Sequence, residues 1–239
     1  MERITGESTT SAIRHQRYIS EDWMLFLLGS LLDGLRLVHE RGFIHRDIKP
    51  DNIYLRDDLS PVLLDFGFAR MAVESRTQSL TALVTPGFAP FEQFQTDESA
   101  GRQGPWTDIY SLAATVYSAI SDKRRVPDAF ARVNTVTSNL PDPMVPALEL
   151  GRGRFSDKFL AAIDVPLQVQ PGGGISSMAP SLKRIIISPL KQARIACRRW
   201  GLRAFRKRRS ARRLHLAKLR LLLMRTKLRN SSREATWPR

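Results

Sequence analysis

The sequence predicts an α+β fold that is mainly helical, contains one short β-hairpin and continues into a basic tail that is helical or disordered. Three observations support this fold class. Apolar residues recur at helical spacing in two long stretches. Two short runs of β-prone residues, separated by turn formers, predict the hairpin. The positive charge is concentrated at one end of the 239-residue chain, which indicates that two kinds of sequence are joined.

The first predicted element is an amphipathic helix between Ser20 and Gly42. Ser20 is a suitable N-cap, and Glu21 and Asp22 follow in the first turn, where acidic side chains interact favourably with the helix dipole. Gly42 is suited to end the helix. The apolar positions of this helix are Met24, Leu27, Leu28, Leu31, Leu35 and Val38.

The second element is a hairpin of residues 53–55 and 62–64, with residues 56–61 between its strands. The strands carry Ile, Tyr, Leu and Val, whereas the connection is rich in Asp, Ser and Pro. Because a hairpin brings its two open ends together, Asn52 before the first strand and Asp65 after the second should lie side by side.

After the hairpin, the sequence predicts a loop over 68–84 and a turn at 85–87. A second helix is expected to begin with Thr107 as its N-cap, and its strongly apolar face predicts a buried, central position. Residues 121–154 contain four prolines and are expected to be rich in loops. A further helix is predicted over 155–164.

The charge distribution divides the chain. Residues 183–239 contain 20 Lys and Arg and one acid, a net charge of +19, whereas the residues before them contain 18 basic and 22 acidic side chains, a net charge of −4. We therefore expect a lead-in over 1–19, a folded domain over 20–165, a glycine-containing linker over 166–182 and a basic tail over 183–239.

Four local motifs occur in sequence order. Residues 45–52 read His-Arg-Asp-Ile-Lys-Pro-Asp-Asn, and residues 65–67 read Asp-Phe-Gly, with the predicted hairpin between them. Residues 85–93 contain Ala-Pro-Phe-Glu, and residues 106–112 begin Trp-Thr-Asp. Together these motifs resemble the catalytic loop, metal-binding motif, activation-loop end and central helix of eukaryotic-type serine/threonine protein kinases, as bacterial members carry them. The resemblance covers residues 20–165 and implies the C-terminal lobe of a kinase.

This resemblance implies a phosphoryl-transfer site that uses ATP and Mg²⁺ and acts on Ser or Thr of protein substrates. Asp47 would accept or orient the proton of the attacking hydroxyl. Lys49 would contact the transferred γ-phosphate, and Thr85 would help to orient Asp47 and Lys49. Asn52 and Asp65 would bind the Mg²⁺ that bridges the phosphates.

The resemblance also implies supporting roles. Arg46 matches the arginine that pairs with a phosphorylated activation loop, and Asp108 matches the buried carboxylate that holds the catalytic-loop backbone. His45 and Phe66 are expected to be packing residues, and Gly67 completes its motif. The candidate phosphorylation sites in the loop are Ser75, Thr77, Ser79 and Thr81.

The sequence departs from the family pattern in two places. No glycine-rich loop and no lysine occur before Lys49, so we expect the phosphate-anchoring N-terminal lobe to be missing and the kinase domain to be truncated. No arginine lies between residue 164 and Arg184, so Glu92 is expected to lack the arginine that pairs with it in the family. Two hypotheses follow: a kinase with weak or no activity as an isolated chain, or an inactive kinase-like remnant that acts as an interaction module.

The last expectations concern the basic tail and the location of the protein in the cell. The tail over 183–239 has two interpretations. It is either a basic amphipathic segment that binds anionic membrane or nucleic acid, or sequence foreign to the fold, such as an altered reading frame. The abrupt change in composition favours the second interpretation. Cys197 is the single cysteine, the start of the chain resembles no signal peptide, and no apolar run approaches the length of a membrane span. These features predict a cytoplasmic protein without a transmembrane segment.

Overall fold

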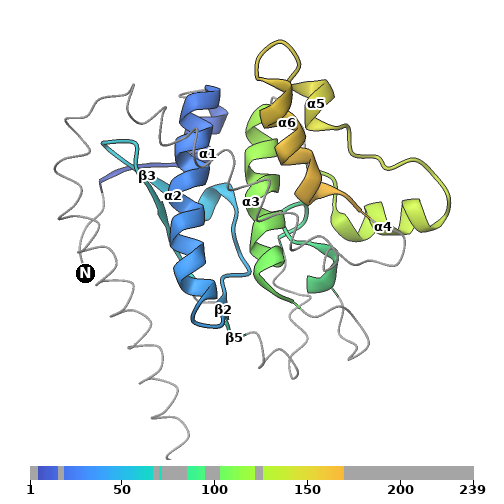
Figure 1. Ribbon diagram of the computed structural model, residues 1–239, viewed down its shortest axis with the longest axis horizontal. Coiled ribbons are helices and arrows are strands. Elements are labelled where there is room, and N and C mark those ends of the chain that lie inside the picture. The colour runs from blue at the N-terminus through green and yellow to red at the C-terminus, as the bar shows by residue number, and fades with distance from the viewer. Residues whose placement is uncertain are drawn as a thin grey trace, which may run out of the picture. The chain divides into compact units, whose positions relative to one another are not determined.

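The computed structural model describes six stretches of the chain, all inside one compact unit that runs from Met1 to Arg194. Helix α3 (Pro105–Ile120) packs against both α2 (Glu21–His39) and α6 (Asp157–Asp164), and a small antiparallel sheet lies beside α2 (Figure 1). The predicted α+β class is confirmed. Within the described ranges, no helix is long and apolar enough to cross a bilayer. The described residues are 5–15, 19–66, 70–71, 85–94, 103–121 and 126–169.

Helix α2 forms as its periodicity predicts. The Ser20 hydroxyl accepts a hydrogen bond from the Trp23 N–H at 3.3 Å, which satisfies one of the free N–H groups at the helix start. The helix ends at His39, and Gly42 adopts the left-handed conformation with φ of 76° three residues later. Its buried apolar positions include Met24, Leu27, Leu31, Leu35 and Val38.

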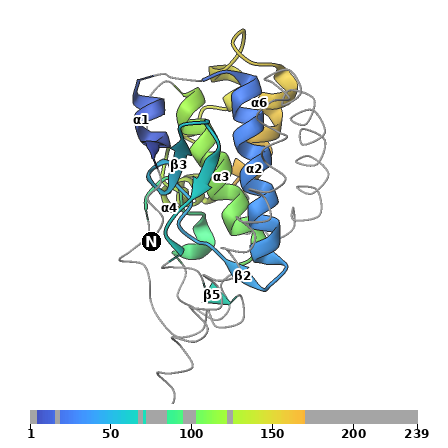
Figure 2. The ribbon, with the colours of Figure 1, turned by 90° about the vertical axis from the view of Figure 1, so that its left-hand side faces the viewer.

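The predicted hairpin is confirmed as β3 (Ile53–Arg56) and β4 (Pro61–Leu63), with Ile53 opposite Leu63. The sheet gains a third strand that the sequence analysis left out, because β1 (Gly6–Ser8) pairs antiparallel with β3. Helix α1 (Thr9–Arg14) packs on β1 and β3, while α2 packs on β4 (Figure 2). Residues 6–14 are therefore part of the fold that surrounds the hairpin.

The second sheet joins the two segments that flank the His-Arg-Asp and Asp-Phe-Gly motifs. Strand β2 (Phe43–Ile44) pairs antiparallel with β5 (Arg70–Met71), and Phe43 lies opposite Met71. This pairing ties the segment before His45 to the segment that follows the Asp-Phe-Gly motif. The loop predicted over 68–84 lies outside the described residues apart from β5.

Helix α3 is the buried central helix that the sequence predicts, but its start was misplaced. Twelve of its sixteen residues are buried. Its N-cap is Gly104, not Thr107, and the Gly104 N–H donates to the Thr107 hydroxyl at 3.2 Å. Pro105 occupies the first helical position, which suits proline because no intrahelical hydrogen bond is needed there. The Thr107 side chain thus accepts a hydrogen bond from the N-cap backbone, although Thr107 itself lies inside the first helical turn.

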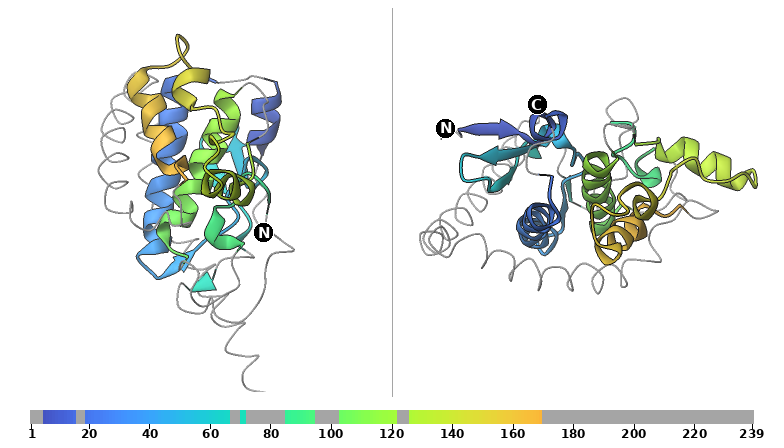
Figure 3. Two further views of the ribbon diagram at one scale, coloured as in Figure 1. Left: turned by 90° about the vertical axis from the view of Figure 1, so that its right-hand side faces the viewer. Right: turned by 90° about the horizontal axis from the view of Figure 1, so that it is seen from above.

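Residues 121–154 are rich in loops, as expected, but they also include two helices that the sequence analysis left out. They contain α4 (Ala129–Thr137) and α5 (Ala147–Leu150), each of which follows within two residues of a proline in the sequence. Asp128 caps α4 by accepting from the Ala131 N–H at 3.0 Å. Seen from above in Figure 3, α4 lies on the far side of α3 from α2. The helix predicted over 155–164 is confirmed as α6, with Ser156 as its N-cap.

A buried arginine joins α4 to the rest of the helical core. Arg132, 2% exposed, donates from Nε and Nη2 to the two Asp142 carboxylate oxygens at 2.9 and 2.6 Å. Its Nη2 also donates to the Leu167 carbonyl at 2.7 Å, and its Nη1 lies 3.4 Å from the Tyr110 hydroxyl on α3. Partial burial would raise the pKa of Asp142, but hydrogen bonds from Arg132 and the Met144 N–H hold the pKa below its usual range.

Breaking the buried Arg132–Asp142 pair should lower the free energy of unfolding far more than breaking an exposed ion pair. Asp142→Asn removes the charge but keeps the shape, and leaves the Arg132 charge buried without compensation, so we expect a loss of about 3 kcal/mol in the free energy of unfolding. Glu40→Gln breaks the Arg36–Glu40 pair, whose side chains are 62% and 54% exposed, and should cost less than about 0.5 kcal/mol. Urea unfolding of both variants makes the comparison, and equal losses would contradict it.

Candidate active site

Three donors converge on the carboxylate of Asp47. Lys49 Nζ lies 2.9 Å from Asp47 Oδ1 and donates to the Thr85 hydroxyl at 3.0 Å. The Thr85 hydroxyl in turn lies 3.3 Å from Asp47 Oδ1. The Asn52 amide donates to Asp47 Oδ2 at 2.7 Å and to the Asp47 carbonyl at 2.8 Å. Three of the predicted site residues therefore contact Asp47, and its carboxylate is fixed in one orientation.

The hairpin accounts for the position of Asn52. The Leu64 N–H donates to the Asn52 carbonyl at 2.8 Å, which extends the strand pairing to the two open ends. Asp65 follows directly, exposed to solvent and in the left-handed conformation with φ of 56°. The two hydrogen bonds that the Asn52 side chain makes with described residues both use its amide nitrogen, which leaves its side-chain oxygen as an acceptor within that part of the chain.

Asn52 and Asp65 together present hard oxygen donors of the kind that Mg²⁺ prefers. Among the described residues, no group of three or more His, Cys, Asp or Glu gathers at one point. This small donor set does not form an all-protein cage, but it fits the usual binding of Mg²⁺ through one or two protein oxygens together with phosphates and water.

His45 lies behind the site and is fully buried. The Asp47 N–H donates to its Nδ1 at 3.3 Å, so Nε2 carries the proton and donates to the Leu64 carbonyl at 3.1 Å. Burial lowers the pKa of His45 despite the nearby carboxylates, which favours the neutral ring. The ring meets Phe66 edge to face, with centroids 4.7 Å apart. His45 thus connects the backbone of Asp47 to the end of β4.

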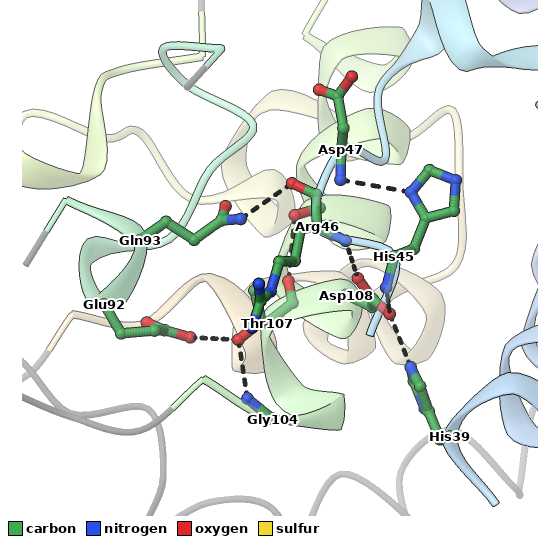
Figure 4. Close-up of polar contacts among 10 residues, drawn as sticks. His39, His45, Arg46, Asp47, Glu92, Gln93, Gly104, Thr107 and Asp108 are labelled. Atoms are coloured by element: carbon green, nitrogen blue, oxygen red, sulfur yellow. Dashed lines mark hydrogen bonds and ion pairs between the residues drawn. The ribbon is translucent and has the colours of Figure 1, made fainter. Parts of the chain in front are cut away.

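Asp108, in the first turn of α3, holds the backbone before Asp47 (Figure 4). Its fully buried carboxylate accepts from the His45 N–H at 2.9 Å and from the Arg46 N–H at 2.8 Å. His39 Nε2, at the end of α2, lies 2.7 Å from the same carboxylate. Arg46 is 7% exposed and adopts φ of 71°, which turns its N–H towards Asp108.

His39 is a residue that the sequence analysis missed. It lies in the last turn of a helix, and its partner is 69 residues away in the sequence. A histidine in the last helical turn is favoured by the helix dipole alone, so its sequence position carried no signal of the contact with Asp108.

Glu92 is buried, with 4% of its surface exposed. One carboxylate oxygen accepts from the Thr107 hydroxyl at 2.9 Å, a contact that the sequence did not suggest, and the other has no hydrogen-bond partner. Burial raises the pKa of Glu92 from an ordinary value of 4.5 to about 7. The neighbouring Gln93 donates to the Arg46 carbonyl at 2.9 Å.

The remaining predicted residues cannot be placed. Gly67 lies outside the described residues. The candidate phosphorylation sites Ser75, Thr77, Ser79 and Thr81 also lie outside them.

Comparisons with known proteins agree on one family. The family model described as "Protein kinase domain" matches residues 1–161. Serine/threonine-protein kinase PknA of Nostoc sp. is 38% identical over 130 residues, which cover 52% of this chain and 22% of that protein. Serine/threonine-protein kinase PknL of Mycobacterium tuberculosis is 31% identical over 122 residues, which cover 51% of this chain and 30% of that protein.

A solved structure agrees with the sequence comparisons. The apo form of PpkA-294 matches with a TM-score of 0.56 and 30% sequence identity, over 76% of this chain and 61% of that chain. The chain therefore spans less than a third of the length of the two curated relatives above, and less than two thirds of this structural neighbour.

The buried Glu92 predicts a pH dependence of stability. Because its pKa is about 7 in the folded state and about 4.5 in the unfolded state, the unfolded chain loses this proton first as pH rises. The contribution of Glu92 to stability is therefore highest below pH 4.5 and falls as pH rises to 7, by up to about 3 kcal/mol in total.

Glu92→Gln keeps the shape and cannot ionise, so it isolates this effect from other titrating groups. The difference in the free energy of unfolding between Glu92→Gln and the parent chain should change by about 3 kcal/mol between pH 4.5 and 7.5, in favour of the variant at the higher pH. Urea unfolding across this pH range measures the difference. A difference that stays constant with pH would show that Glu92 is charged in the fold or paired with a cation.

Proposed function

The chain belongs to the protein kinase domain family, and from this premise we propose that residues 20–165 are the catalytic C-terminal lobe of a serine/threonine protein kinase. The reaction is transfer of the γ-phosphate of MgATP to Ser or Thr hydroxyls of proteins. The observation that supports this most directly is the convergence of Lys49, Asn52 and Thr85 on the Asp47 carboxylate. A solvated surface aspartate does not usually bind three side-chain donors, one of which, Thr85, comes from a segment 38 residues away.

In this proposal Asp47 acts on the attacking hydroxyl. Phosphoryl transfer depends mainly on positioning and on neutralising charge. The hydroxyl oxygen forms a bond to the γ-phosphorus, the bond from that phosphorus to the β–γ bridging oxygen breaks, and the hydroxyl proton passes to Asp47. Lys49, 2.9 Å from Asp47 Oδ1, places a positive charge where the transferred phosphoryl oxygens would pass. Thr85 holds Lys49 and Asp47 in this arrangement.

Mg²⁺ would be held by the side-chain oxygen of Asn52 and the carboxylate of Asp65, and when bound it would neutralise the phosphates of ATP. Asn52 also donates to Asp47, so a single side chain links the base to the metal position. Arg46 and the loop residues Ser75, Thr77, Ser79 and Thr81 remain candidates for regulation by phosphorylation, with His45, Phe66, Gly67 and Asp108 in supporting roles.

We propose that this chain by itself turns over slowly or not at all. Within its 239 residues no lysine precedes Lys49, so the chain offers no strand lysine to the α- and β-phosphates. An alternative function is an inactive kinase-like interaction module. The net charge of +19 over residues 183–239 favours contact of that segment with anionic membrane or nucleic acid in either case, and such binding should weaken steeply with added salt.

Asp47→Asn tests the proposed base against a neighbouring carboxylate. Asp51 lies four residues on, is exposed and accepts from the Thr10 hydroxyl at 2.7 Å, so Asp51→Asn is a matched control. We expect MgATP-dependent phosphorylation of a generic basic protein to be slow with the parent chain and unchanged with Asp51→Asn. Asp47→Asn should lower it at least about 100-fold, because general-base catalysis contributes that much or more.

A second measurement distinguishes the kinase from the inactive interaction module. Electron paramagnetic resonance of Mn²⁺ with ATP should show nucleotide-dependent metal binding by the parent chain and its loss in Asp65→Asn. Metal–nucleotide binding together with transfer that depends on Asp47 supports the kinase. Transfer that survives Asp47→Asn would contradict the assignment of the base, and absence of both binding and transfer would favour the interaction module.

A further inference from the structure

The peptide group between Arg46 and Asp47 is hydrogen-bonded to side chains at both of its polar ends (Figure 4). The Asp47 N–H donates to His45 Nδ1 at 3.3 Å. The Arg46 carbonyl accepts from Gln93 Nε2 at 2.9 Å, which is the shorter of the two contacts. Because this planar group leads directly into Asp47, its orientation sets the direction in which the Asp47 side chain leaves the backbone.

The conformation of Arg46 explains why this peptide group needs support. Arg46 adopts φ of 71°, in the left-handed region that non-glycine residues rarely enter. A residue stays in such a conformation when its surroundings determine it from several sides. Asp108 accepts from the Arg46 N–H, and Gln93 holds the Arg46 carbonyl. Gln93 is therefore an anchor of this turn, and it comes from a segment 47 residues further along the chain.

The backbone of Gln93 is fixed by contacts outside the loop that carries Asp47. Gln93 is the last residue of the 3₁₀ turn η4 (Phe91–Gln93). Within this turn, Glu92 is hydrogen-bonded to the first turn of α3, and the Phe91 ring stacks on Phe130 of α4 with centroids 5.8 Å apart. Contacts with two helices thus hold the turn, so the Gln93 amide reaches the Arg46 carbonyl from a well-supported position.

The hydrogen bonding of the Gln93 amide indicates that its donor group is what matters. A carbonyl can only accept, so the NH₂ group of Gln93 must face Arg46. This orientation leaves Gln93 Oε1 buried without a hydrogen-bond partner among the described residues, which is unfavourable. An apolar side chain of similar size would fill the same space without that disadvantage. The contact that an apolar side chain could not make is the donation to the Arg46 carbonyl.

We propose that Gln93 is a positioning residue for Asp47 and acts through the carbonyl of Arg46. The inference rests on the proposed function, because phosphoryl transfer is the reaction that requires the Asp47 carboxylate at a fixed place. Side-chain contacts hold the carboxylate itself, whereas Gln93 holds the backbone from which it projects. Without the Gln93 donor, the peptide group before Asp47 loses one of its two hydrogen bonds and becomes more mobile. The Asn52 amide, which donates to both the carbonyl and the carboxylate of Asp47, then loses its fixed acceptors.

Nuclear magnetic resonance of the full chain tests the proposal with three substitutions at one position. Gln93→Met keeps the length and removes the donor, Gln93→Glu keeps the shape and replaces the donor by an acceptor at neutral pH, and Gln93→His restores an N–H at a similar reach. Hydrogen exchange of the Asp47 N–H should become at least about tenfold faster in Gln93→Met and Gln93→Glu, and stay within about twofold of the parent in Gln93→His. The side-chain NH₂ signal of Asn52 should shift in the first two variants alone.

Gln103→Met is the matched control. Gln103 is half-buried like Gln93, also has a buried Oε1 without a partner among the described residues, and donates to a different backbone carbonyl, that of Glu92, at 3.5 Å. It should leave the Asp47 exchange rate unchanged.

Three results would overturn the proposal. The first is Gln93→Met with an unchanged exchange rate at Asp47. The second is an equal increase in Gln103→Met or at the amides of α2, which would indicate a general loss of stability. The third is Gln93→His with exchange as fast as in Gln93→Met, which would assign the effect to shape. Because these measurements need no phosphoryl transfer, their outcome is separate from that of the kinase assay.

Discussion

The buried carboxylate of Asp108 is the interaction on which the site depends. It accepts hydrogen bonds from two successive backbone N–H groups, those of His45 and Arg46, and meets His39 from α2. Two successive N–H groups can point to one carboxylate because Arg46 adopts φ of 71°, a conformation that costs non-glycine residues about 1 kcal/mol or more. Hydrogen bonds to a charged acceptor contribute about 1.5–3 kcal/mol each, so they offset this strain. The same turn directs Asp47 away from α3 (Figure 4).

The first turn of α3 supports the loop that carries Arg46 and Asp47 from two sides. Asp108 holds Arg46 by its N–H, while Thr107, one residue earlier, holds Glu92. Gln93 then returns to Arg46 and donates to its carbonyl. These contacts form a closed ring through α3, the catalytic loop and the Ala-Pro-Phe-Glu segment. Glu92 is the least well satisfied residue of this ring, because one of its carboxylate oxygens is buried without a hydrogen-bond partner among the described residues. Glu92 is therefore connected, through its neighbour Gln93, to the residue next to Asp47.

Local signals predicted much of this fold, and distant contacts account for what they missed. The helix after Ser20 and the hairpin follow from caps, periodicity and turn residues, all of which act within a few positions. The start of α3 was misplaced because Thr107 resembles an N-cap although it acts from the third helical position, behind Gly104 and Pro105. Helix α4 was missed because the prolines around it obscured a short helix.

The site shows the same division between local and distant information. Asp47, Lys49 and Asn52 occur within one short motif, so the sequence could place them together. Thr85 was placed with them only through the family resemblance, and the folded chain brings its hydroxyl within hydrogen-bonding distance of Asp47 and Lys49. The pairs His39–Asp108 and Thr107–Glu92 join segments that only the folded chain brings together. The buried Arg132–Asp142 pair likewise depends on burial, which the composition of a loop-rich stretch does not reveal.

The hydrogen bonds of Asp47 also limit how it can act in the proposed reaction. A carboxylate offers about four acceptor positions. Lys49 and Thr85 occupy Oδ1, and Asn52 occupies one position on Oδ2. Among contacts with the described residues, the position that remains is on Oδ2, beside the Asn52 amide, whose side-chain oxygen makes none of the hydrogen bonds above. A substrate hydroxyl that binds there would be adjacent to the metal position and to Lys49, which is where an acceptor must lie to receive a phosphoryl group. The arrangement of the proposed base, cation and metal donors is thus set by contacts within the chain.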